Sequence, residues 1–232
     1  MKVRLLAALL AAGVAASIAA GSAGAAADSN CPGGTLAGGI YNNVVVNSTC
    51  TATGEIWIKG NLTVNGNGAF LATFGGIING NVQSWPGSVL ILEGFSMTHG
   101  VSASNAQSVF LEGNLIGQGV LIQGGGGVPA GACSRHDVPI THSPIAVVLG
   151  NEVVGSVSIG GRGGCENWIV ENEIAGSVNF VNNQADPTEG NAVALNLITS
   201  NLFCKNNNPH PAGNGSNSVG GTINFPGDCA TP

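Results

Sequence analysis

The most regular feature of the chain is a set of aliphatic positions that recurs about every 20 residues. Most of these residues follow a small or polar pair such as Gly-Asn or Gly-Ser, and the steps between them are 19 to 24 residues, apart from one step of 37. Repetition at a fixed period of this length is typical of repeat folds. The positions are Leu62, Val82, Val101, Val120, Val157, Val178, Leu202 and Ile223.

Three further columns keep the same register. The position four residues earlier is apolar in every unit: Ile58, Ile78, Met97, Ile116, Val153, Ile174, Ile198 and Val219. The position two residues later is mostly apolar: Val64, Ser84, Ala103, Ile122, Ile159, Phe180, Cys204 and Phe225. Six residues earlier, the later units carry asparagine: Asn114, Asn151, Asn172, Asn196 and Asn217. Because these columns keep a constant spacing from the marker positions, they indicate that one structural unit is repeated along the chain.

This pattern predicts an all-β fold, a single right-handed parallel β-helix of about eight coils with three short strands per coil. Alternating apolar positions indicate strands with one buried face. One coil cannot bury its inner face alone, so successive coils stack at the strand spacing of about 4.8 Å. The uneven steps favour the right-handed form over a strict hexapeptide helix. The asparagines are expected to adopt the left-handed conformation of sharp turns and to bond to the amide one coil away.

The N-terminal segment 1–27 is predicted to be a signal peptide. Lys2 and Arg4 precede an apolar run that is followed by small residues, which is the order found in secretory signals. We therefore expect a secreted protein, extracellular or associated with the cell wall. Residues 28–232 would form the β-helix domain, in which 28–55 is either an N-terminal cap or a first coil. No other segment is apolar enough over a sufficient length to span a membrane.

Composition narrows the classes of function. Charged residues make up 8% of the chain, 38 residues are glycine, and the net charge of −6 falls to about −8 without the signal segment. Low charge with many apolar residues excludes a coiled coil and a disordered chain. The acidic balance without a basic cluster argues against nucleic acid and anionic polysaccharide as partners. A neutral polysaccharide or a cell-wall surface remains open.

Export makes disulfides the expected state of the six cysteines. No CxxC pair is present, which weakens a metal interpretation. Among the 15 possible pairings we favour sequence neighbours: Cys31 with Cys50, Cys133 with Cys165, and Cys204 with Cys229.

The 37-residue step indicates an inserted loop within 124–144. Insertions in solenoids project from one face and often carry binding residues. The candidate ligand-binding residues are Arg135, His136, Asp137 and His142 in the loop, Arg162 in the next coil, and Trp85 at a coil corner. The alternative is a surface loop that is only anchored by a disulfide.

No catalytic residue, cofactor or metal site is assigned. Ser134, His136 and Asp137 are nearly consecutive, whereas a catalytic triad needs residues from separate positions. The stacked pairs Glu152 with Glu173 and Glu93 with Glu112 are either calcium ligands or hydrated surface carboxylates. Trp57, Trp85 and Trp168 could offer stacking faces to sugars, although Trp168 begins an apolar strand and is better explained by packing.

The chain resembles small secreted bacterial right-handed β-helix proteins, mostly uncharacterised. The resemblance lies in the signal segment, the run from Cys31 to Val46, and units such as Gly60-Asn61-Leu62-Thr63-Val64. It implies architecture and export. Pectate lyases and polygalacturonases are more distantly similar in fold class, but the polygalacturonase motifs are absent, with Thr98-His99-Gly100 the nearest fragment. No catalytic role therefore transfers from them.

Three functions remain open at this point. The first is a non-catalytic extracellular structural or surface-interaction protein. The second is a carbohydrate-binding or carbohydrate-active protein, and the third is a scaffold that polymerises end to end. An ice-binding surface is disfavoured, because outward Thr-x-Thr rows are missing beyond Thr51-Ala52-Thr53.

Overall fold

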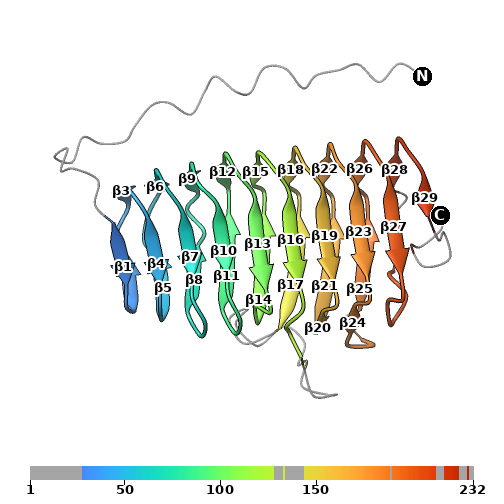
Figure 1. The fold of residues 1–232 in the computed structure, drawn as a ribbon, viewed down its shortest axis with the longest axis horizontal. Coiled ribbons are helices and arrows are strands. Elements are labelled where there is room, and N and C mark those ends of the chain that lie inside the picture. Colours follow the sequence, from blue (N-terminus) through green and yellow to red (C-terminus); the bar gives the residue numbers. More distant parts are fainter. Residues whose placement is uncertain are drawn as a thin grey trace.

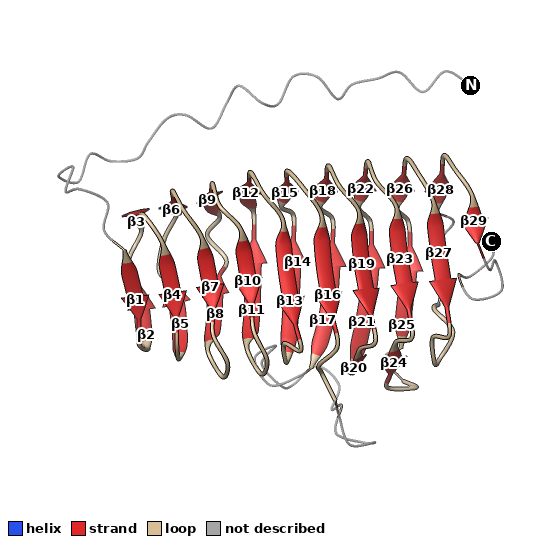
Figure 2. Cartoon of the chain, viewed as in Figure 1, coloured by secondary structure: helices blue, strands red, loops and turns tan. Residues whose placement is uncertain are grey.

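The chain folds into a rod of stacked turns, a right-handed parallel β-helix (Figure 1). The computed structural model describes residues 28–127, 133, 144–188, 190–212, 217–224 and 229. Strands and connecting turns account for this part of the chain, with no helix among the described residues (Figure 2). Accordingly, no described helix is long and apolar enough to cross a membrane.

Three parallel sheets run along the rod, and each turn adds a strand to most of them. Sheet A contains β1 (Ser29–Cys31), β4 (Val44–Val46), β7 (Leu62–Val64), β10 (Val82–Ser84), β13 (Val101–Ser104), β16 (Val120–Gln123), β19 (Val157–Gly160), β23 (Val178–Val181), β27 (Leu202–Lys205) and β29 (Ile223–Asn224).

Sheet B contains β2 (Gly34–Leu36), β5 (Thr49–Ala52), β8 (Ala69–Ala72), β11 (Val89–Glu93), β14 (Ser108–Glu112), β17 (Ile145–Leu149), β21 (Glu166–Val170) and β25 (Asn191–Ala194). Sheet C contains β3 (Gly39–Tyr41), β6 (Ile56–Ile58), β9 (Gly76–Ile78), β12 (Phe95–Met97), β15 (Leu115–Ile116), β18 (Glu152–Val153), β22 (Glu173–Ile174), β26 (Leu197–Ile198) and β28 (Ser218–Val219). Beside β21, a small fourth sheet pairs β20 (Gly163–Gly164) with β24 (Gln184–Ala185).

The strand register confirms the repeat that the sequence predicts. The marker column runs in register through sheet A, from Leu62 to Val82, Val101 and onward to Ile223. The column four residues earlier does the same in sheet C, from Ile58 to Val219. The described part contains nine strands in sheet C rather than about eight coils, because residues 29–41 form a turn of their own.

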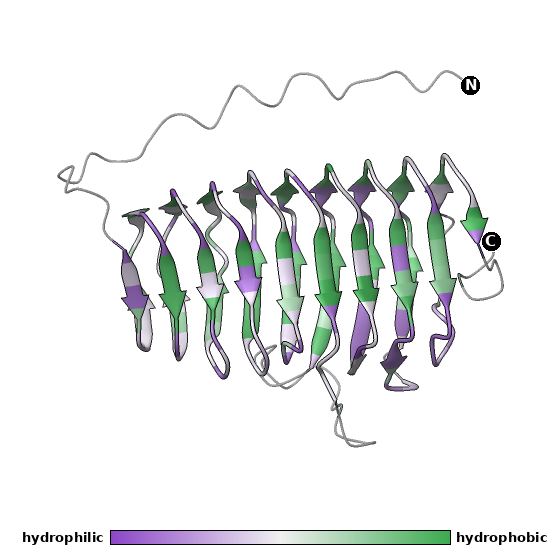
Figure 3. Cartoon of the chain, viewed as in Figure 1, coloured by the Kyte–Doolittle hydropathy of each residue, from purple (hydrophilic) through white to green (hydrophobic). Residues whose placement is uncertain are grey.

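The core is one apolar column along the axis. Inward residues of all three sheets belong to a single cluster that extends from Cys31 to Cys229. Because parallel strands of successive turns superimpose, like side chains meet inside, and Ile58, Ile116, Ile174 and Ile198 are fully buried. Apolar colour accordingly recurs on the strands of turn after turn (Figure 3). At the first turn, Tyr41 packs on the end of this core and its hydroxyl donates to the Ala37 carbonyl oxygen, 2.7 Å away.

The asparagine column forms a buried ladder at the corner between sheets B and C. Each side chain accepts from a backbone N–H one turn earlier, which is that of Phe95 for Asn114 and that of the preceding ladder asparagine for the others; for example, Asn172 Oδ1 lies 2.8 Å from Asn151 N. The amide-to-amide bonding is therefore confirmed. The expected left-handed conformation is displaced by one residue, because positive φ occurs at the residue before each of the four asparagines Asn114, Asn151, Asn172 and Asn196. That preceding residue makes the sharp turn, which leaves the asparagine free to point inward.

All three predicted disulfides are present. Cys31 pairs with Cys50, Cys133 with Cys165, and Cys204 with Cys229. The first and third lie inside the core, one near each end of the rod, where a solenoid lacks a further turn to cover it. Three disulfides indicate an oxidising environment.

Candidate functional site

Trp85 stands at the corner that follows β10, held by a tight turn. Residues 85–88 have the sequence Trp-Pro-Gly-Ser, and Ser88 N donates to the Trp85 carbonyl oxygen at 3.0 Å. Gly87 has φ +77°, which is the conformation that a type II turn requires at its third position after proline at the second. Gly87 N also bonds to Asn105 O in the next turn, at 3.0 Å. The backbone that carries the indole is thus fixed on both sides.

Two buried serines support this turn from inside. Ser84 lies in the otherwise mostly apolar column that follows the marker, and its hydroxyl shares a 2.6 Å hydrogen bond with the Ser88 hydroxyl. The Ser88 hydroxyl also lies against the Trp85 carbonyl oxygen, to which it donates. Both serines are at most 1% exposed. A hydroxyl pair at this depth is explained by its bonds to the turn, since a buried polar group without partners destabilises the fold.

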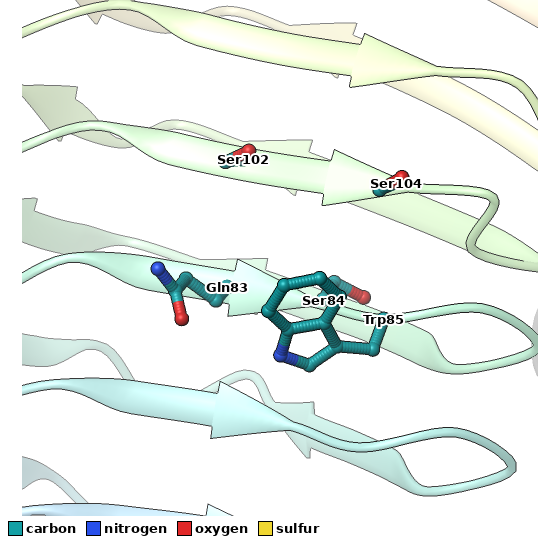
Figure 4. A pocket seen from close by; sticks show the side chains of 5 residues that line it. All are labelled: Gln83, Ser84, Trp85, Ser102 and Ser104. Atoms are coloured by element: carbon teal, nitrogen blue, oxygen red, sulfur yellow. The ribbon is translucent and has the colours of Figure 1, made fainter.

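The Trp85 side chain lines a shallow depression on the outer face of sheet A. The depression has a volume of about 40 Å³ and is lined by Gln83, Ser84, Trp85, Ser102 and Ser104. The indole is 44% exposed, and it lies over β10 with its broad face visible from outside, beside the Gln83 amide (Figure 4). Ser102 and Ser104 come from the neighbouring strand β13 (Figure 4).

The surroundings of this depression are polar but uncharged. Among the strands of sheet A as described, only β27 carries a charged residue, Lys205. At the same corner, Asn65 Nδ2 in the preceding turn donates to Asn47 Oδ1 at 2.6 Å, which continues an amide row one turn further. Amides therefore lie on one side of Trp85 along the rod axis, and the Ser104 hydroxyl lies on the other.

Arg162, a sequence candidate for ligand binding, is placed inside the rod. Its side chain is 1% exposed. Nη1 donates to the carbonyl oxygens of Ala106 and Gly124, at 2.8 and 3.0 Å. Nη2 donates to those of Gln107 and Ile145, at 2.6 and 2.7 Å. Burial lowers the pKa of the guanidinium to about 10, so it remains charged at neutral pH.

These four bonds give Arg162 a structural role. Gly124 stands at the start of the insertion and Ile145 directly after it, so one guanidinium holds both ends of the inserted segment against the previous turn. The planar fork of arginine suits several fixed acceptors at once. This arrangement leaves the side chain almost no surface to offer a ligand.

Arg162 also begins a second polar ladder, which sequence reasoning missed. Arg162 N donates to Asn183 Oδ1 at 3.3 Å, and Asn183 N donates to Asn207 Oδ1 at 3.0 Å. The residues just before these three, Gly161, Asn182 and Asn206, have positive φ, as in the first ladder. The paired Asn-Asn sequences at 182–183 and 206–207 were the available signal. Arginine replaces asparagine where the insertion requires a longer reach.

The other sequence candidates, Arg135, His136, Asp137 and His142, lie outside the described residues. Of the inserted segment's interior, Cys133 is described, and it packs with Ile145, Val147 and Cys165 on the outer face of sheet B. The disulfide to Cys165 joins the insertion to the start of β21. The insertion is thus anchored twice, by this disulfide and by Arg162.

Trp168 and Trp57 differ from Trp85 in their surroundings. Trp168 packs against the Ile145 and Val147 cluster, and its indole N–H donates to Gly190 O at 3.2 Å, in line with the packing interpretation. Trp57 on β6 is half-buried and lies under the Lys59 ammonium, 5.9 Å from the ring centroid. Trp85 therefore has the most exposed indole of the three.

The stacked glutamates are neighbours, as the repeat requires. Glu93 pairs in register with Glu112, and Glu152 with Glu173. Burial of the Glu93 carboxyl raises its pKa, and the neighbouring Glu112 carboxylate raises it further by a smaller amount. Within the described ranges, no group of three histidine, cysteine, aspartate or glutamate side chains is arranged to hold a metal ion.

Comparison of the chain with protein-family models, with curated proteins and with solved structures finds no match. The fold and the local geometry are therefore the basis for a functional assignment.

Proposed function

We propose that the protein is an exported, non-catalytic β-helix that acts outside the cell as a structural or surface-interaction protein. The observation that carries this proposal is the continuous apolar core with a disulfide near each end. Each interior turn of such a rod is covered by its two neighbours, and a disulfide lies near each end, where one neighbour is missing. Disulfides add stability that persists only in an oxidising compartment.

The N-terminal segment supports the same proposal. A charged start, an apolar run and small residues precede Asp28. Cleavage near Ala27 would release the β-helix as the mature protein. The resemblance to small secreted bacterial β-helix proteins agrees with export, and we extend it here only to location and architecture.

The test combines fractionation with a binding and activity assay. The full chain is expressed in a secreting bacterial host, and the mass of the mature protein locates the cleavage site. The purified protein is then incubated with insoluble bacterial cell walls and with neutral polysaccharides, and both pelleted protein and released reducing ends are measured. We expect a mature chain in the medium or wall fraction, protein in the pellet and no new reducing ends.

Other outcomes would identify the alternative functions. Reducing ends that increase with time would show a carbohydrate-active enzyme instead. Concentration-dependent filaments in electron micrographs would show a scaffold that assembles end to end.

A further inference from the structure

From the geometry around Trp85, we propose that the outer face of sheet A binds a neutral glycan, with the indole of Trp85 as the stacking platform. This inference rests on the proposed surface-interaction role and adds the class of ligand and the place where it binds. The two can fail separately, because cell-wall binding can survive the loss of Trp85.

The chemistry of the depression selects the ligand. A pyranose ring has one face of C–H groups and a rim of hydroxyls, so it requires an apolar flat surface bordered by hydrogen-bonding groups. Trp85 supplies the flat surface, 44% exposed. The Gln83 amide and the hydroxyls of Ser102 and Ser104 supply donors and acceptors within the same depression. Amides and hydroxyls both donate and accept, as sugar hydroxyls do.

The charge around the depression excludes the alternative ligand classes. The strands that flank it, β7, β10 and β13, carry no charged side chain. A uronate polymer or a phosphate backbone would lack the cationic partners that anion binding uses. An apolar peptide or lipid would in turn cover Gln83 and Ser102 without satisfying them, at a cost in free energy.

The same geometry predicts the direction of the bound chain. Gln83 pairs in register with Ser102 one turn later, and Asn65 lies at the same corner one turn earlier, within the amide row. Polar groups thus follow one another along the rod axis at the strand spacing of about 4.8 Å. An extended glycan that runs along the axis at the corner of Trp85 would meet the Asn65 amide, the indole and the Ser104 hydroxyl in successive turns.

The platform is also pre-organised, which reduces the entropy that binding loses. Pro86 and Gly87 fix the turn, and Ser84 and Ser88 hold it from inside. The turn below fits closely, because a Cβ at Gly66 would come within 3.0 Å of the Pro86 carbonyl oxygen. The backbone that carries the indole therefore needs little ordering before a sugar stacks on the ring.

The test is affinity electrophoresis of the mature protein in gels that contain one soluble polysaccharide at a time. The neutral probes are mixed-linkage β-glucan, hydroxyethylcellulose and galactomannan, and polygalacturonate is the anionic probe. We expect retardation by at least one neutral probe and none by polygalacturonate. Trp85→Ala should weaken binding roughly tenfold, the effect of losing one aromatic stacking contact, whereas Trp85→Tyr should retain most of it because a ring remains.

Leu197→Ala is the matched control, since Leu197 is 50% exposed on sheet C, away from the depression. It should bind as the unmodified protein does, and far-ultraviolet circular dichroism should show that all variants are folded. The inference is overturned if no neutral probe is retarded, if polygalacturonate binds equally well, or if Trp85→Ala retains full affinity. Should cell walls still bind while Trp85→Ala has no effect, the proposed function would stand and the site would lie elsewhere.

Discussion

Replacement of one ladder asparagine tests how far the corner hydrogen bonds stabilise the rod. Asn172 is 2% exposed in the middle of the first ladder. Its Oδ1 accepts from Asn151 N at 2.8 Å and from Asn151 Nδ2 at 3.0 Å. The two hydrogens of its Nδ2 are shared among Val148 O, Val170 O and Asn196 Oδ1, at 2.8, 2.9 and 3.0 Å. Asn172→Leu keeps the number and branching of the side-chain heavy atoms, leaves no cavity because leucine is the larger residue, and removes all of these bonds.

The expected loss of unfolding free energy depends on which hydrogen bonds the former partners of Asn172 keep. Asn151 N loses its acceptor inside the protein, and an orphaned buried donor costs about 1–3 kcal/mol. Val170 O still accepts from Gly150 N at 3.0 Å, so the donated bonds count only at their net value of about 1 kcal/mol each. Two donated bonds and one orphaned N–H together give about 4 kcal/mol of lost unfolding free energy.

Guanidinium unfolding, followed by far-ultraviolet circular dichroism, measures this loss. Asn217→Leu is the matched control, because Asn217 ends the same ladder and is only half-buried. Water can reach the Asn217 side chain, and we expect a loss below about 1.5 kcal/mol. The slope of the transition must remain constant for the comparison to hold. If Asn172→Leu costs no more than Asn217→Leu, the ladder does not stabilise the fold in the way described.

Three further predictions concern the insertion and the glutamates. Arg162→Lys should lower the free energy of unfolding in guanidinium by about 2–4 kcal/mol, because an ammonium cannot hold four carbonyls; an unchanged free energy of unfolding would refute the anchoring role. Mild reduction followed by alkylation and mass spectrometry should label Cys133 and Cys165 first, since Cys133 is half-buried while the other two bridges lie in the core; simultaneous labelling of all six would contradict this. Because the pKa of Glu93 is raised, the folded protein holds its proton more tightly than the unfolded chain, and stability falls as pH rises through that pKa. Glu93→Gln should therefore raise the thermal midpoint at pH 7 and change it least at pH 4. Equal shifts of the midpoint at the two pH values would exclude Glu93 as the cause of this pH dependence.

The sequence predicts features that recur. The inward columns, their register and the amide ladder appear in many units, so chance substitutions do not hide them. The cysteine pairing was also predictable, because sequence neighbours one or two turns apart end up side by side in a solenoid. The left-handed position was assigned one residue too late, since glycine, glutamate and leucine fill it in turn at Gly113, Glu171 and Leu195. No residue type marks it consistently.

Features that occur once are harder to predict. Arg162 was expected to be accessible because arginine is seldom fully buried. The sequence around it does not reveal that four backbone carbonyls accept hydrogen bonds from its guanidinium. Those carbonyls come from residues 17 to 56 positions earlier in the chain. The burial of this arginine is a consequence of the insertion, because the ends of the inserted segment need a donor that a ladder asparagine could not supply. Sequence periodicity carries no information about such a departure.

Departures from the repeat are nevertheless where a solenoid can acquire a function. An inward residue is constrained by the turns on both sides, whereas an exposed outward residue has fewer packing neighbours to constrain it. Ser84 breaks an apolar inward column, and Trp85, the next residue, places an indole at a corner that carries amides and hydroxyls in neighbouring turns. The two departures are linked, because the Ser84 hydroxyl holds Ser88 and Ser88 holds the Trp85 carbonyl. An interior polar pair bonded to the turn that carries an exposed indole is more readily explained by a requirement at the surface than by one in the core.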